Sequence, residues 1–153
     1  MPFCVDTSAW MDGWQRHYPP DVFPSLWLRL EEKIAAGHII CSEEVYVELA
    51  KKADDLHKWI QGRKEMLLPL TEAVQEQAAQ LLSQYPRLVD TLRNRSKADP
   101  FVVASAIVLG AVVVTGEIRT GKLDKPRIPD VCDAIGVRGI GFLQMIRELS
   151  LTF

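Results

Sequence analysis

Short apolar runs alternate along the chain with longer stretches in which apolar residues recur at helical spacing. The short runs have the length of strands and are rich in β-branched residues. They predict strands over 3–5, 38–41, 112–114 and 137–140, and either a strand or an extended connection at 67–68. The longer stretches predict helices over 22–36, 42–62, 71–84, 99–110, 130–136 and 142–149. Strands and helices therefore alternate from one end of the sequence to the other.

Capping and breaking residues set the helix boundaries. Gly37 and Gly110 follow two of the apolar stretches as C-terminal glycines do, and Pro86 stops the helix over 71–84. Ser42 is a good N-cap for the helix that runs to Gly62. Residues 6–8 predict a turn, residues 126–129 predict a loop, and residues 87–97 have no clear pattern.

Strands that alternate with helices and are apolar on both faces are typical of a parallel sheet with helices on each side. The prediction is an α/β fold, a three-layer α/β/α sandwich with a mostly parallel central sheet of four to five strands. A length of 153 residues suits a single domain over 1–153. In such sheets ligands bind beyond the carboxyl ends of the strands.

Acidic residues recur at that edge of the predicted sheet. Asp6 follows the first strand directly, and Glu117 follows the strand over 112–114. Glu44 and Glu48 lie in the helix after the second strand, Asp99 opens the apolar helix, and Asp130 opens the next short helix. Ser8 and Thr115 add hydroxyl groups beside two of these acids, where they can orient a carboxylate or a bound water.

Each of these acids also has a structural interpretation. Asp6 suits an Asx turn, and Glu48 is spaced to pair with Lys51 or Lys52 on its helix. Asp99 suits an N-cap before Pro100, or an N3 acid below a Ser96 cap. Asp130 suits an N-cap, and Glu117 suits a solvated loop. Several carboxylates gathered at one edge of the sheet nevertheless indicate a site more strongly than any single acid does.

Carboxylates crowded into a partly dry cleft repel one another unless cations compensate. Carboxylate oxygens are preferred ligands of Mg²⁺ and Mn²⁺, and two such ions activate water and stabilise the leaving oxygen in phosphodiester hydrolysis. We therefore expect this acidic edge to bind divalent metal and to hydrolyse a phosphodiester without a side-chain nucleophile. Ser8 and Thr115 are the expected supporting residues.

Charge and cysteine content modify this expectation. A net charge of −2 is not typical of nucleic-acid-binding domains. Basic residues nevertheless flank two of the acids, as the set Arg87, Arg93, Arg95 and Lys97 before Asp99, and the set Arg119, Lys122, Lys125 and Arg127 after Glu117.

Three cysteines in apolar surroundings suit reduced thiols, and no signal peptide or membrane span is predicted. A cytoplasmic location is expected. The histidines lack zinc-ligand spacing, and the tryptophans at helical spacing suit a core.

Four segments resemble the PIN-domain ribonuclease family. They are Val5-Asp6-Thr7-Ser8, the helix with Glu48, and Lys97-Ala-Asp-Pro-Phe followed by Val114-Thr115-Gly116-Glu117. Their order and spacing cover nearly the whole chain. The resemblance implies a PIN-like fold, four metal-binding catalytic acids at Asp6, Glu48, Asp99 and Glu117, and Mg²⁺ or Mn²⁺ as cofactor. Glu117 departs from the pattern, because many members have aspartate or asparagine there.

The resemblance also implies a biological role. VapC-like members are endoribonuclease toxins of prokaryotic toxin–antitoxin pairs, silenced by a small antitoxin protein, and many relatives form homodimers. The segment from Lys125 to Cys132 is similar to a PIN-like subgroup of uncharacterised prokaryotic proteins, in which Asp130 would assist metal binding. The implied substrate is RNA, and no membrane partner is implied.

Two other functions remain open at this point. Acids at the edge of a parallel sheet also serve Mg²⁺-dependent phosphotransfer, but the sequence lacks paired acids after the first strand. The second alternative is a catalytically inactive PIN-like module that binds RNA or protein. Retention of all four acids disfavours this module, and the unusual Glu117 favours it.

Overall fold

The computed structural model describes residues 1–89 and 97–152, apart from the side chain of Asp54. The strands are β1 (Phe3–Val5), β2 (Ile39–Ser42), β3 (Leu67–Leu68), β4 (Val112–Val114) and β5 (Gly139–Ile140). The helices are α1 (Thr7–Met11), α2 (Pro24–Ala35), α3 (Glu43–Lys52), α4 (Asp54–Gln61), α5 (Glu72–Gln84), α6 (Asp99–Leu109), α7 (Ile128–Ile135) and α8 (Phe142–Glu148). A π-helical segment, Asp12–His17, continues α1, and short 3₁₀ turns lie at Lys64–Met66 and Pro86–Leu88.

The five strands form one parallel sheet in the order β3-β2-β1-β4-β5. Cys4 pairs with Ile40 on one side and with Val113 on the other, so β1 lies at the centre. The chain proceeds outward from β1 to β2 and β3 and then returns to β4 on the opposite side. The point between β1 and β4 is therefore the topological switch point, where open α/β sheets bind their ligands.

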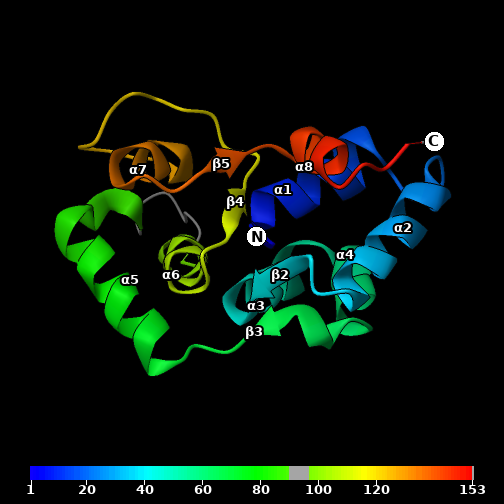
Figure 1. The fold of residues 1–153 in the computed structure, drawn as a ribbon, viewed down its shortest axis with the longest axis horizontal. Coiled ribbons are helices and arrows are strands. Elements are labelled where there is room, and N and C mark those ends of the chain that lie inside the picture. The colour runs from blue at the N-terminus through cyan, green and yellow to red at the C-terminus, as the bar shows by residue number, and fades with distance from the viewer. Residues whose placement is uncertain (90–96, 153) are drawn as a thin grey trace.

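Helices cover both faces of the sheet, which confirms the predicted three-layer α/β/α sandwich. Figure 1 shows α5, α6 and α7 on one side of the strands and α1, α2, α4 and α8 on the other. Cys4, Val5, Val113 and Val114 have no exposed surface, because the central strands are enclosed by both layers. Helix α6 is apolar around most of its circumference and packs against both the sheet and α5.

The tryptophans pack together within the layer that contains α1 and α2. Trp10 lies with its ring centroid 5.7 Å from Trp59, and Trp14 lies 4.9 Å from Trp27. Trp10 and Trp27 are almost completely buried. This arrangement confirms the structural role that their spacing predicts.

The helix predicted over 42–62 is wrong as a single element, because it breaks at Ala53. Ala53 has extended backbone angles (φ −156°, ψ 92°) and is 8% exposed. The break separates α3 from α4, and Leu49 and Leu56 on either side of it both have fully buried side chains. A change of direction that lets both helices bury an apolar face explains the interruption, and the sequence has no glycine or proline there to mark it.

Two smaller boundaries also differ from the prediction. Residues 6–8 do not form an isolated turn, because Asp6 caps a helix that continues into the π-helical segment. Helix α7 begins at Ile128, and Pro129 lies at the helix start, where proline is favoured. Asp130 also lies in the first turn, where an acid complements the helix dipole. In the parts of the chain that the structure describes, no helix is long and apolar enough to cross a membrane.

Candidate functional site

Asp6 lies at the carboxyl end of β1, directly at the switch point. Its Oδ1 accepts a 2.7 Å hydrogen bond from the Ala9 amide, which caps α1. Its Oδ2 accepts a 2.6 Å bond from the Thr115 hydroxyl at the end of β4, and the Ser8 hydroxyl lies 2.9 Å from both carboxylate oxygens. Ser8 and Thr115 therefore hold this carboxylate in one orientation.

Burial has a large effect on the ionisation of Asp6. The residue is 2% exposed, and burial raises its pKa to about 7. Hydrogen bonds from Thr115, Ala9 and Ser8 favour the charged form, whereas repulsion from Glu117 adds to the rise in pKa. A second carboxylate thus lies close enough to Asp6 to oppose its ionisation, and a cation placed between the two would relieve that repulsion.

Glu117 is held by both the strand end and helix α7. Its backbone amide donates to the Thr115 hydroxyl at 3.1 Å, and its Oε2 accepts a 3.2 Å bond from the Ile128 amide at the start of α7. The longer glutamate side chain reaches the first turn of α7 while its backbone stays next to the Asp6 network. The structure therefore brings Asp6, Ser8, Thr115 and Glu117 together.

Asp12 is a further acid at this edge that the sequence analysis did not select. Its carboxylate packs on the backbone of Gly116, so a Cβ atom at Gly116 would overlap Oδ2 of Asp12. Asp12 also pairs with Arg16 through a 3.2 Å contact. It lies six residues after Asp6 in the π-helical segment, a position that could have been found only if residues 7–17 had been predicted as helical.

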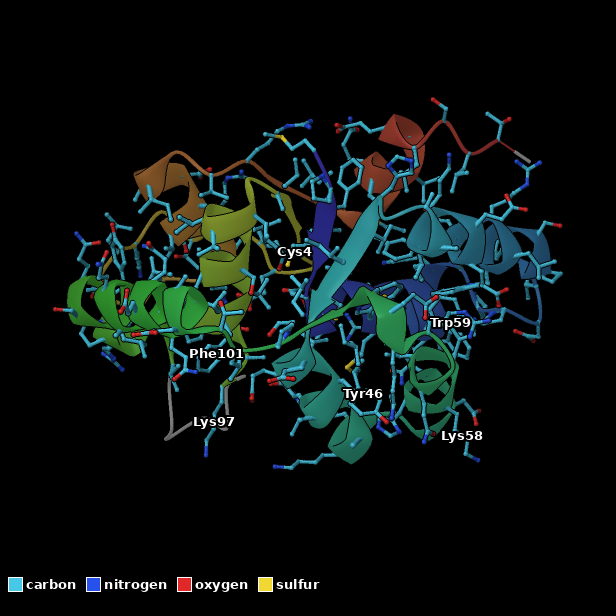
Figure 2. All side chains as sticks on the ribbon, turned by 60° about the horizontal axis from the view of Figure 1, so that its bottom comes forward. Cys4, Tyr46, Lys58, Trp59, Lys97 and Phe101 are labelled. Carbon is cyan, nitrogen blue, oxygen red and sulfur yellow. The ribbon has the colours of Figure 1, made fainter. Side chains whose placement is uncertain are left out.

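Glu48 and Asp99 lie on helices rather than at strand ends. Glu48 is mostly buried, and its Oε1 is 3.4 Å from Nζ of Lys52, the ion pair expected from their helical spacing. Asp99 is 6% exposed and is the first residue of α6, with Ala98 at the N-cap position. Figure 2 shows α3, marked by Tyr46, and the start of α6, marked by Lys97 and Phe101, on the same side of the molecule. Ser96, the alternative cap, and the basic residues Arg93 and Arg95 lie outside the described residues.

Asp130 stabilises the loop that follows β4. Its two carboxylate oxygens accept hydrogen bonds from the amides of Thr120, Gly121 and Arg127 and from the Thr120 hydroxyl, at 2.7–2.9 Å. Burial acts to raise its pKa, but these bonds outweigh burial and hold the pKa below its usual value. This bonding gives Asp130 a structural role in the 118–127 loop.

A complete metal-binding set is not present among side chains of residues 1–89 and 97–152. No group of three or more histidine, cysteine, aspartate or glutamate side chains there is placed to hold a metal ion. A divalent cation would fit best beside Asp6, because Glu117 opposes the ionisation of this buried carboxyl at a ligand-binding position of the fold.

Two clefts open beside Glu117. The first, of about 420 Å³, is named the aromatic cleft here, and its distinctive lining residues are His17, Tyr18, Phe142 and Leu143. The second, of about 480 Å³, is named the arginine cleft, and its distinctive lining residues are Arg16, Ile118 and Arg127. Asp12, Gly116, Glu117 and Arg119 line both clefts. The acidic edge thus separates an aromatic surface from a basic one.

Comparisons with known proteins agree with this architecture. The family model described as "Domain of unknown function (DUF4411)" matches residues 3–153. A crystal structure of VapBC2 from Rickettsia felis bound to a DNA fragment from their promoter is similar in fold, with a TM-score of 0.55 at 15% sequence identity. The match covers 92% of this chain and 98% of that chain. No curated protein matches the sequence.

These findings confirm the PIN-like fold that the spacing of the acidic motifs indicates. The match in fold extends over most of both chains, and the parallel sheet places the first and fourth motifs on adjacent strand ends. The family match extends over almost the whole sequence. The chain belongs to the DUF4411 family.

Proposed function

We propose that this protein is a metal-dependent endoribonuclease, and that residues 1–153 act as one nuclease domain. The single observation that carries the proposal is the buried Asp6 carboxylate beside Glu117 at the switch point of a PIN-like sheet. Asp6 is buried, and repulsion from the Glu117 carboxylate further opposes its ionisation, so positive charge is favoured beside the two acids. A divalent cation held there would supply this charge and would lower the pKa of a bound water, so that the water could attack a phosphodiester.

The chain's own residues divide the work. Asp6, Glu117, Glu48 and Asp99 are the proposed catalytic acids and would hold Mg²⁺ or Mn²⁺, with Asp130 acting through the loop that it stabilises. Ser8 and Thr115 keep the Asp6 carboxylate fixed, and Asp6 must lose its proton before it can bind a cation. Arg119 lies on both clefts and is itself oriented by a bidentate pair with Asp133 at 2.6 and 3.0 Å. Its guanidinium suits a phosphate group beside Glu117.

The proposed biological role is that of a toxin in a prokaryotic toxin–antitoxin pair. The similarity in fold to VapBC2 from Rickettsia felis supports this role, and a small antitoxin protein is the proposed partner. A homodimer is the proposed assembly. The three unpaired, buried cysteines are compatible with the proposed cytoplasmic location.

The two alternatives predict different chemistry. An aspartyl phosphotransfer site needs an accessible nucleophilic carboxylate, whereas Asp6 is 2% exposed and both of its oxygens accept hydrogen bonds. A catalytically inactive binding module would bind RNA or protein without cutting, and the incomplete metal-binding set among the described side chains favours it over phosphotransfer.

The test is cleavage of labelled single-stranded and structured RNA by the purified protein with Mg²⁺, with Mn²⁺ or with EDTA. Asp6→Asn, Glu48→Gln, Asp99→Asn and Glu117→Gln should each abolish metal-dependent cutting while the protein stays folded. Asp124→Asn is the matched control, because Asp124 is exposed on the loop after Glu117. RNA binding without metal-dependent cutting would favour the inactive module, and equal cutting by the wild type and all four variants would refute the proposed site.

A further inference from the structure

The aromatic cleft has the composition of a site for a flat, partly apolar group. Tyr18 and Leu143 supply apolar surface, with the buried Phe142 ring behind Tyr18, while His17, Asp12 and Arg119 supply polar groups at the same cleft. A volume of about 420 Å³ lies within the range of small-molecule sites in proteins. Unpaired bases are recognised by stacking on aromatic side chains combined with a few hydrogen bonds to their edges.

The aromatic wall is fixed before any ligand arrives. The rings of Tyr18 and Phe142 are stacked with centroids 5.9 Å apart and an interplanar angle of 25°. Phe142 also contacts Trp10, and a Cβ atom at Gly13 would lie 2.7 Å from its Cζ, so the ring is closely enclosed. The indole of Trp27 donates a 2.6 Å hydrogen bond to the Tyr18 carbonyl and anchors the backbone at that position. A preformed surface of this kind reduces the entropy cost of binding.

The position of the cleft indicates which group it would bind. The aromatic and arginine clefts meet at Asp12, Gly116, Glu117 and Arg119. On the other side, Arg16 and Arg127 provide positive charge for phosphates, which favour guanidinium groups. A strand that crosses Glu117 would therefore place phosphates over the arginine cleft and the adjacent base over the aromatic cleft.

We propose that the aromatic cleft binds a single unpaired nucleobase next to the phosphate that is cut. This inference rests on the proposed ribonuclease function. A paired base is stacked within its helix and cannot enter the cleft, so double-stranded RNA is excluded from productive binding. His17, an exposed residue at the cleft, is the proposed contact to the edge of the base.

The test measures binding without cleavage. Fluorescence anisotropy in EDTA, at one fixed salt concentration, compares short single-stranded RNAs that differ only in the position of one abasic nucleotide. Stacking of a base contributes roughly 1–3 kcal/mol, which corresponds to about a 5- to 150-fold change in affinity. One abasic position should therefore weaken binding to the wild-type protein at least about fivefold, and the other positions should have smaller effects.

Variants separate this cleft from general attraction to RNA. Leu143 is 46% exposed at the cleft, and Leu28 is 59% exposed on α2 and does not line either cleft, so Leu143→Glu and Leu28→Glu form a matched pair. Leu143→Glu should remove the difference between intact and abasic RNA, whereas Leu28→Glu should preserve it. His17→Ala should reduce this difference, and His38→Ala, at another exposed histidine, should not. Arg16→Ala should weaken binding to both RNAs equally.

Several outcomes would overturn the inference. Equal affinity of the wild type for intact RNA and every abasic RNA would exclude a base site, and so would a lack of RNA binding. Equal weakening of both RNAs by Leu143→Glu would attribute its effect to charge alone. Metal-dependent cutting of RNA, with binding that does not depend on any single base, would refute only this inference. Binding that depends on one base, without any cutting, would refute the proposed nuclease but would support the aromatic cleft as a base-binding site.

Discussion

The hydroxyl of Thr115 donates a 2.6 Å hydrogen bond to Oδ2 of Asp6, a residue 109 positions earlier in the chain. The two residues follow adjacent parallel strands, β1 and β4, which pair from Phe3 with Val112 to Val5 with Val114. Because the strands diverge into different helices and loops beyond this point, the bond fixes the geometry of the candidate site where the backbone ladder ends.

Thr115→Val tests the contribution of this bond to stability. Valine keeps the shape of threonine but leaves the buried Asp6 carboxylate without its shortest hydrogen bond. We expect the free energy of unfolding in urea at neutral pH to fall by about 1–3 kcal/mol. Thr152→Val, at an exposed position, should have almost no effect. Equal stability of the wild type and Thr115→Val would show that the bond is not important for the fold.

The raised pKa of Asp6 predicts that stability depends on pH. In the unfolded chain this carboxyl ionises near 3.8, whereas in the folded protein its pKa is about 7. Between these pH values the folded state retains a proton on Asp6 that the unfolded state has lost. The contribution of Asp6 to the free energy of unfolding is therefore complete below about pH 4 and declines as the pH rises to about 7. The decline attributable to Asp6 is about 4 kcal/mol.

The measurement is urea unfolding across this pH range in EDTA. Asp6→Asn should flatten the profile relative to the wild type, because asparagine does not titrate. Asp124→Asn, at an exposed loop position, should retain the wild-type slope. A profile of Asp6→Asn as steep as that of the wild type would assign the dependence to other groups.

Binding of a divalent cation should offset this loss of stability. A proton and a cation compete for Asp6, so Mg²⁺ or Mn²⁺ should raise the melting temperature more at about pH 8 than at about pH 5.5. At a cation concentration about 100 times the Kd, linkage gives about 2.7 kcal/mol, or roughly 5–10 °C for a domain of this size.

Variants assign that thermal shift to the site. Asp6→Asn and Glu117→Gln should each remove most of it, and Asp124→Asn should retain it. If all three variants responded to Mn²⁺ as the wild type does, the cation would bind elsewhere on the protein.

Asp130→Ala should destabilise the loop after β4 rather than abolish cation binding. The substitution removes the acceptor of three backbone amides and one hydroxyl, and we expect a loss of about 2–4 kcal/mol in unfolding free energy. Because the pKa of Asp130 is held low, its contribution should be present at neutral pH and disappear as the pH falls. The Mn²⁺-induced shift in melting temperature should persist, and Asp124→Ala is the control. Loss of that shift would instead favour a role for Asp130 in binding the metal.

The sequence predicted those parts of the site that depend on strand order. Asp6 and Thr115 follow β-branched or apolar runs, and the carboxyl ends of parallel strands meet at one edge, so their proximity follows from the pattern. Ser8 was predictable for the same reason. Ser8 lies two residues beyond Asp6, and its hydroxyl also accepts a 2.9 Å hydrogen bond from the Gly116 amide.

Other features depend on tertiary packing that no local pattern reveals. Asp12 was missed because no helix was predicted over 12–17, and its approach to Gly116 joins residues more than a hundred positions apart. The break at Ala53 has no local marker, and the bonds to Asp130 come from a loop with several possible conformations. The clefts could not be predicted at all, because their walls combine α8, the loop after β4 and the π-helical segment.

The central position of β1 also sets a time order for assembly of the site. Ribosomes add roughly 5–20 residues per second, so about 5–20 s separate the synthesis of Asp6 from that of Thr115, its partner on β4. During this interval the nascent chain contains the first strand without the neighbour that completes the switch point. The candidate site is therefore incomplete until synthesis of the chain has passed Thr115 and β4 can pair with β1.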